Sequence, residues 1–178
     1  MTVLPILIAP DPRLKVTSDP VDTVDGNIRR LMDDLVETMR SADGIGLAAP
    51  QVAVAKRVIV VAAPRGDDDD DGEGRSKDPL CMANPEIVWK SDTIETHEEG
   101  CLSLPEHFAE VKRPISVRVR YRDRNNETCE IEAGELLGTC IQHEMDHLDG
   151  ILFVDHISML KRKMILRKLT KGKRSETR

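Results

Sequence analysis

The sequence LLGTCIQHEMDHL spans residues 136–148 and holds two histidines four residues apart. Its apolar residues recur at three- and four-residue spacing, which predicts a helix that ends at Gly150. On this helix His143 and His147 lie one turn apart on the same face, about 6 Å along the axis. Two imidazoles on an otherwise apolar helix would lose hydration without a partner. We therefore interpret them as ligands of one metal ion, with Glu144 beside it to polarise a bound water.

An amphipathic helix is predicted upstream, beginning after Asp25. Its apolar residues form one stripe with charged residues opposite: Ile28, Leu31, Met32, Leu35, Val36 and Met39. Asp25 can cap the first turn by accepting from backbone N–H groups. Gly44 is predicted to end the helix in a left-handed conformation. The β-branched run at residues 58–61 then predicts a strand.

Strand periodicity dominates residues 82–133. At residues 115–121 apolar side chains alternate with serine and arginine, which predicts a half-buried strand. The sequence Asp-Arg-Asn-Asn at residues 123–126 predicts a turn into the next strand, around residues 129–131. Helices at both ends of a β-rich middle favour one α+β domain over residues 1–178.

Two segments carry concentrated charge. Residues 64–79, PRGDDDDDGEGRSKDP, predict a solvated acidic surface loop, because the five aspartates at 67–71 repel one another. A divalent-cation site there is the less favoured alternative, since no EF-hand spacing is present. Residues 157–174 hold eight Lys and Arg and no acid, and predict a basic helix. Its apolar docking stripe is predicted to be Leu160, Met164, Ile165 and Leu169.

Composition excludes several classes of protein. The chain has 178 residues, 39% hydrophobic and 33% charged, which excludes a disordered chain and a membrane protein. Aromatic residues make up only 2%, so the core is expected to be aliphatic and no aromatic row for stacking bases is available. The net charge of −6 gives no global attraction for nucleic acid, so DNA is not an expected partner. The first residues do not resemble a signal peptide, and the four cysteines form no CxxC pair, so we expect a cytoplasmic protein with reduced thiols.

A catalytic site built on two histidines needs a third ligand. Phe153 stands where a metzincin would have histidine, and the downstream acids Asp149, Asp155 and Glu176 do not fit a thermolysin-like enzyme. The ligand is therefore expected upstream of the helix. Cys140 lies about 10 Å from His147 along the helix axis, too far to share an ion, and is interpreted as a small cavity-lining group.

Among the other cysteines, Cys81 and Cys129 lie in strand-like sequence and are interpreted as core fillers. Cys101 stands apart because it follows Gly100, which permits close backbone approach, and because a neighbouring cation would stabilise its thiolate. The alternatives left open by the residues are a zinc endopeptidase and a metal-binding protein without catalysis. An endopeptidase would leave Cys101 and Gln51 unexplained, and a structural site would leave Glu144 without a role.

Three motifs, GIGLAAPQ at 44–51, EGCLS at 99–103 and QHEMDH at 142–147, resemble the signature motifs of the peptide deformylases, in that order. Residues 10–14, PDPRL, are also similar to that family, and the chain as a whole resembles the type with a C-terminal helix. The resemblance covers nearly the whole chain apart from the acidic loop. It implies mostly antiparallel sheets around a central helix that bears HExxH, with an N-terminal amphipathic helix and a basic C-terminal helix.

The resemblance also implies an activity. Peptide deformylases remove the N-formyl group from nascent polypeptides that begin with formyl-methionine and release formate. By resemblance, Cys101, His143 and His147 hold a divalent metal ion, and a metal-bound water attacks the formyl carbon with Glu144 as general base. The ligand set suits zinc, iron, cobalt or nickel, and the family points to Fe(II) as the native ion. The basic helix would attach such an enzyme to the ribosome; the alternative is a merely solvated helix.

Substrate contacts follow from the same resemblance. Gln51 and the backbone N–H of Leu102 are expected to stabilise the oxyanion, and the peptide is expected to lie as an extra strand with its formamide N–H on the Gly46 carbonyl. The other substrate-binding positions implied are Gly44, Ile45, Gly100, Leu136, Thr139 and Cys140, with His143.

Six further positions take lesser roles. Phe108 stands where some relatives carry an arginine that contacts the substrate. Glu99 and Arg113 are predicted to form an ion pair under the site. The other histidines are predicted to be surface or structural residues: His97, His107 and His156.

Overall fold

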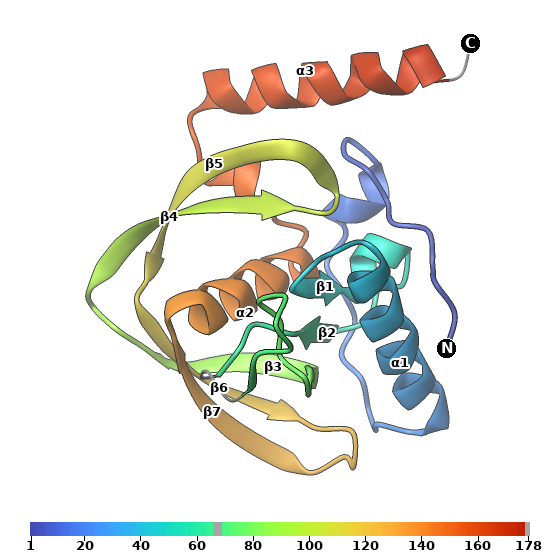
Figure 1. Ribbon diagram of the computed structural model, residues 1–178, viewed down its shortest axis with the longest axis vertical. Coiled ribbons are helices and arrows are strands. Elements are labelled where there is room, and N and C mark those ends of the chain that lie inside the picture. Colours follow the sequence, from blue (N-terminus) through green and yellow to red (C-terminus); the bar gives the residue numbers. More distant parts are fainter. Residues whose placement is uncertain (66–68, 177–178) are drawn as a thin grey trace.

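The computed structural model describes residues 1–65 and 69–176, in which two antiparallel sheets enclose a central helix (Figure 1). The larger sheet has the strand order β1-β2-β3-β6-β7. Its strands are β1 (Gly46–Ala48), β2 (Val58–Val61), β3 (Leu80–Lys90), β6 (Ser116–Arg122) and β7 (Thr128–Gly134). All neighbouring pairs are antiparallel, and β1 lies at one edge. In the strand predicted from alternation, Val117 and Val119 are buried while Arg118 and Arg120 are exposed.

The central helix is α2 (Glu135–Leu148), which contacts β1, β2 and β7. It ends as predicted, with Gly150 in the left-handed region at φ +70°. Gly150 also lies directly against the backbone of Lys15, where a Cβ would be 2.6 Å from the carbonyl oxygen. Much of α2 is buried, including both of its histidines. The HExxH motif therefore sits inside the molecule on a rigid element.

Helix α1 (Gly26–Ser41) covers the other face of β1 and β2. Asp25 caps it as predicted, because its side chain accepts from the N–H groups of Asn27 and Ile28. The predicted C-terminal stop is wrong. Asp43, not Gly44, takes the left-handed conformation, at φ 53°, and the Gly44 N–H closes the last turn on the carbonyl of Met39. Aspartate tolerates this region better than most residues, so glycine was not required there.

A second sheet is formed by the hairpin of β4 (Ile94–Cys101) and β5 (Leu104–Pro114). Its tight turn at residues 102–103 brings the end of β4 directly above α2 (Figure 1). Beneath the hairpin, Leu104 and Val111 share a buried cluster with the short 3-10 helix η4 (Phe153–Asp155). The hairpin thus carries Cys101 to the histidines of α2.

The C-terminal helix is α3 (Met159–Glu176), which lies across the outside of the β4–β5 hairpin (Figure 1). It begins two residues later than the predicted range. The predicted docking stripe is partly wrong, because Leu160 and Met164 are 71% and 53% exposed. Ile165, Leu166 and Leu169 face the protein instead, since they pack on the cluster that contains η4. No helix among the described residues is both long and apolar enough to cross a membrane.

The described part of the acidic loop is tied down by arginines. Asp69 pairs with Arg65, and Asp71 pairs with Arg75. Asp67 and Asp68, two of the five adjacent aspartates, lie outside the described residues. The described aspartates belong to no cluster of the metal-binding type, so nothing observed favours the alternative of a cation site.

Among the cysteines, all four are free thiols. Cys81 is a core residue as predicted. Cys129 is only half-buried on β7, which corrects its interpretation as a core filler, because β7 is the outer strand of its sheet.

Candidate metal centre and active site

The thiol of Cys101 lies against two imidazoles that belong to another element, those of His143 and His147. The two imidazoles are one turn apart on α2, with ring centroids 5.1 Å apart and nearly perpendicular planes. Cys101, at the end of β4, places its Sγ 3.3 Å from Nε2 of His147. One ligand atom from each of the three residues lies within 4.8 Å of the others, and the described chain holds no other such cluster. A sulfur and two ring nitrogens at this spacing can surround a single ion.

The orientation of His143 is fixed by Glu99. Its Nδ1–H donates to Glu99 Oε2 at 2.8 Å, so Nε2 is left for a metal. The predicted pair of Glu99 with Arg113 is confirmed, since the guanidinium donates to both carboxylate oxygens. Burial by itself would raise the pKa of Glu99, but the hydrogen bonds from Arg113 and His143 lower that pKa to about 2. The acceptor on His143 is therefore a permanent carboxylate.

Two buried polar atoms of this site, Nδ1 of His147 and Oε2 of Glu144, have no hydrogen-bond partner among the described residues. Burial lowers the pKa of His147 well below its ordinary value, so the ring is neutral, as a metal ligand must be. Burial raises the pKa of Glu144 to about 7. A carboxylate oxygen that is buried and unpaired beside the sulfur–imidazole cluster fits a site designed to hold a metal ion and a water. The residues present therefore fit a divalent ion.

The cluster forms the floor of a cavity of about 500 Å³. Every predicted site residue lines it except His147, which is 1% exposed and lies deeper. Those that line it are Gly44, Ile45, Gly46, Gln51, Gly100, Cys101, Leu102, Leu136, Thr139, Cys140, His143 and Glu144. Gly46 touches the floor so closely that a Cβ would clash with Glu144 Oε1 and lie 2.7 Å from Cys140 Sγ. The glycine is thus required by the close approach of β1 to α2.

Gln51 is held in a defined orientation within the 3-10 helix η2 (Ala49–Val52). Its Oε1 accepts from the Ala48 N–H at 2.8 Å, so its amide nitrogen points toward β4. Nε2 donates to Ser103 Oγ at 3.1 Å and lies 3.6 Å from Cys101 Sγ. The amide therefore presents its N–H groups beside the sulfur, which a residue bonded only to its own backbone would not do.

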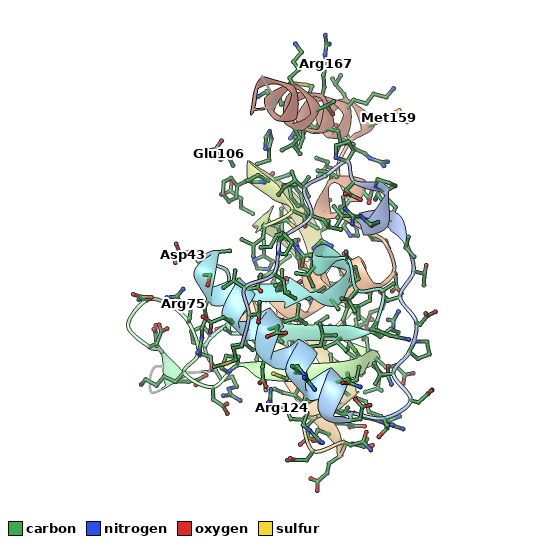
Figure 2. All side chains as sticks on the ribbon, turned by 90° about the vertical axis from the view of Figure 1, so that its right-hand side faces the viewer. Asp43, Arg75, Glu106, Arg124, Met159 and Arg167 are labelled. Atoms are coloured by element: carbon green, nitrogen blue, oxygen red, sulfur yellow. The ribbon has the colours of Figure 1, made fainter. Side chains whose placement is uncertain are left out.

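Several residues near the site were not singled out by sequence reasoning. Asp146 accepts a hydrogen bond from Arg113, and the ring of Phe153 stacks on that of His143. The signal for Asp146 was its place inside the HExxH motif. Acidic side chains also line the mouth of the cavity, including Asp43 and Glu106, which Figure 2 shows on the same side of the molecule. Phe108 is 63% exposed at this mouth, with its ring against Gly100.

The polypeptide deformylase family model matches residues 3–163 of this chain. The chain belongs to the polypeptide deformylase family. A curated peptide deformylase from Methylocella silvestris is 53% identical over 172 residues, which cover 97% of this chain and 86% of the relative. A crystal structure of peptide deformylase from Ehrlichia chaffeensis superposes with a TM-score of 0.91 at 41% identity, covering 99% of this chain and 100% of that one.

A second deformylase structure carries a peptide. It is the Met-Ala-Ser-bound class I type b peptide deformylase from Acinetobacter baumannii, with a TM-score of 0.79 at 35% identity over 88% of this chain and 99% of that one. These matches confirm the resemblance, the α+β fold class and the enzyme class predicted from the sequence, an amide hydrolase of protein biosynthesis. The matched regions cover nearly the full length of this deformylase.

Proposed function

We propose that this deformylase removes the formyl group from the N-terminal formyl-methionine of nascent polypeptides and releases formate. One observation carries the proposal: a sulfur and two imidazoles converge beside the unpartnered carboxylate of Glu144, at the floor of a cavity bordered by an edge strand. The Acinetobacter relative is bound to Met-Ala-Ser, a peptide that begins with the methionine such a reaction would expose. Nascent chains emerge in the cytoplasm, which we propose as the location of the enzyme.

Cys101, His143 and His147 would hold the divalent metal ion. When bound there, the ion supplies Lewis-acid polarisation of the formyl oxygen and makes water acidic enough to ionise near neutral pH. The donor set suits iron, zinc, cobalt or nickel, and we propose Fe(II) as the native ion. Glu99 keeps His143 in the tautomer that offers Nε2.

Glu144 would move the proton. Its carboxylate accepts a proton from the attacking water as the new carbon–oxygen bond forms, and it returns the proton to the departing nitrogen as the carbon–nitrogen bond breaks. Formate and a free amino terminus result, so atoms and charge balance. A pKa raised to about 7 by burial suits a group that must both accept and donate near neutrality.

The negative charge that develops on the formyl oxygen needs donors. We assign this role to Gln51, whose amide nitrogen faces the cavity beside Cys101, and to the backbone N–H of Leu102 in the β4–β5 turn. Removing one such donor typically costs about 3–4 kcal/mol in the barrier. The hydrogen bond to Ser103 holds the amide in place before substrate arrives.

The peptide would bind as an extra strand along Gly44, Ile45 and Gly46, because β1 lies at the edge of its sheet. The Gly46 carbonyl would accept the formamide N–H, and Gly100 would border the peptide on the side of β4. Pairing through the backbone tolerates many sequences, so selection falls on the methionine pocket. The lining assigned to that pocket is Ile45, Leu136, Thr139, Cys140 and His143.

Formate release tests the proposal directly. Anaerobically purified protein is assayed on formyl-Met-Ala-Ser, acetyl-Met-Ala-Ser and an internal peptide without a formyl group. We expect formate from the first peptide and no cleavage of the other two. Cleavage of the internal peptide would favour a zinc endopeptidase, and inactivity of metal-loaded protein on all three would favour a non-catalytic metal-binding protein.

We further propose that α3 attaches the enzyme to the ribosome. Its outer face carries exposed bases, whereas the molecule as a whole is acidic at a net charge of −6. The described bases on that face are Lys161, Lys163, Arg167, Lys168 and Lys171, and Figure 2 shows Arg167 projecting away from the body. A cationic helix set apart from an acidic body suits contact with phosphates of ribosomal RNA.

A further inference from the structure

His156 touches the metal centre's supporting network, although it lies outside every motif. Its Nε2–H donates to Asp146 Oδ2 at 2.7 Å. The same oxygen accepts from Arg113 at 3.0 Å, and Arg113 in turn donates to Glu99. Glu99 accepts the Nδ1–H of His143. A continuous series of hydrogen bonds therefore runs from His156 to a proposed metal ligand.

The charges along this series explain why a second donor is needed. A single cation, Arg113, pairs with both carboxylates of the series, Glu99 and Asp146. All three groups are buried or largely so, with side chains 6%, 4% and 20% exposed respectively. Without another donor, Asp146 would depend on Arg113 alone and compete with Glu99 for it. The N–H of His156 supplies this second hydrogen bond to Asp146, so the guanidinium of Arg113 can remain bonded to Glu99.

The position of His156 is set by η4, the same turn that carries Phe153. His156 ends η4, with its backbone N–H bonded to the Phe153 carbonyl. The ring of Phe153 is fully buried and stacks on the ring of His143, with centroids 6.4 Å apart and planes 27° apart. Asp155, between them, binds Lys15 and Arg162 and so anchors the turn to η1 (Pro12–Lys15) and to α3. One short turn thus supports His143 in two ways, by ring packing and through the hydrogen-bond series.

We propose that η4 is a positioning element for the metal ligand His143, and that His156 is its polar positioning residue, acting through Asp146, Arg113 and Glu99. This inference rests on the proposed metal role of His143. Loss of an outer partner of a metal-bound histidine typically weakens metal affinity about 10- to 100-fold. Since His156 acts at a distance, we expect the lower end of that range.

The experiment measures zinc affinity of the full chain by competition with a chromogenic chelator. We expect His156→Ala to weaken zinc binding about tenfold. His156→Gln, which keeps an N–H donor, should restore most of the affinity. The matched control is His97→Ala, because His97 is about as exposed and also pairs with a carboxylate, that of Glu95, and it lies on β4 near Glu99 without joining the hydrogen-bond series. The thermal midpoint of the metal-free His156→Ala protein should stay at the wild-type value, which separates positioning from general stability.

The outcomes are distinct. Zinc binding by His156→Ala as tight as that by His97→Ala would overturn the inference, and so would a failure of His156→Gln to restore it. If His156→Ala does not fold, His156→Met takes its place, since it fills similar volume without an N–H. A Cys101→Ala variant tests the metal site itself: wild-type zinc affinity in that variant would overturn the proposed ligand set, whereas its loss with an unaffected His156→Ala would overturn only the role of His156.

Discussion

Glu144 shows how much a single residue depends on its surroundings. The same carboxyl group on a solvated helix would be an ordinary acid, but burial on α2 raises its pKa to about 7. One of its oxygens, Oε2, is buried without a partner among the described residues, and Glu144 lines the cavity together with Cys101 and His143. The sequence motif predicts which residue this is, while its proton affinity comes from the packing around it.

Replacing this carboxylate tests its role. We expect Glu144→Gln to lower turnover by about 100-fold or more, since the amide cannot carry a proton, while metal content is retained. Formate release and metal analysis on the same preparation measure the two effects. Glu98→Gln is the control, because Glu98 is an exposed carboxylate that lines the same cavity. A variant that loses the metal but keeps normal turnover would contradict the assigned role.

Gly46 is a second position where adding a single atom is expected to change the activity. In Gly46→Ala the new Cβ would clash with Glu144 Oε1 and Cys140 Sγ, so either β1 or the carboxylate must shift. We expect a fall in kcat/KM of about 100-fold, because small displacements of reacting groups have effects of that size. Gly26→Ala is the matched control, since a Cβ there meets nothing within 4 Å. Full activity in Gly46→Ala would show that β1 does not approach the site this closely.

Each secondary-structure element around the cavity contributes a different part of the site. Helix α2 supplies both imidazoles and the carboxylate, and β4 supplies the sulfur. The 3-10 helix η2 supplies the Gln51 amide, and β1 supplies a backbone edge. Helix α3 supplies none of these groups, and its exposed face is available for a partner.

Removing exposed bases from α3 tests whether this helix attaches the enzyme to the ribosome. We expect Lys163→Gln/Lys168→Gln to reduce co-sedimentation with ribosomes and to flatten its salt dependence, because each lost phosphate contact removes roughly 0.7–0.9 from the slope of log affinity against log salt. Deformylase activity on a short peptide should be unchanged. Arg118→Gln/Arg120→Gln, which removes two exposed charges from β6, is the control. Equal co-sedimentation of the two double variants with wild type would remove α3 as the attachment site.

A bound metal ion would link the two sheets of the molecule. Its proposed ligands come from the β4–β5 hairpin and from α2, which packs on the larger sheet. An ion held between them would bind the folded state far more tightly than the unfolded chain, and so would stabilise the entire domain.

Metal removal should therefore change both stability and activity. At an ion concentration 100 times the dissociation constant, binding adds about 2.7 kcal/mol to the free energy of unfolding, so chelation should lower the thermal midpoint in a scanning experiment. We expect activity to be lost in air as the Cys101 thiolate oxidises to a sulfenic acid or disulfide, and to be restored by a thiol reductant together with anaerobic Fe(II), or with nickel or cobalt. Cys129→Ser should keep the same sensitivity, since Cys129 is outside the cluster. Full, air-insensitive turnover with zinc alone would contradict the proposal of iron.

The sequence determined the elements and the identity of the reacting groups. Helical spacing placed His143 and His147 on one face, alternation predicted β6, and Asp25 marked the start of α1, because these patterns depend only on neighbours along the chain. It failed at Gly44 and at the docking face of α3. In both cases the residue type allowed several outcomes and contacts distant in sequence selected one.

Only the tertiary structure decided which distant groups meet. Cys101 and His147 are 46 residues apart in the chain, and Asp146 and His156 belong to segments with no shared periodicity. The ion pair of Glu99 with Arg113 could be guessed from position, but its link to His143 and onward to His156 could not. Such contacts are set by how the hairpin, η4 and α2 pack together, and packing depends on the whole chain at once, whereas a motif depends on a few adjacent residues.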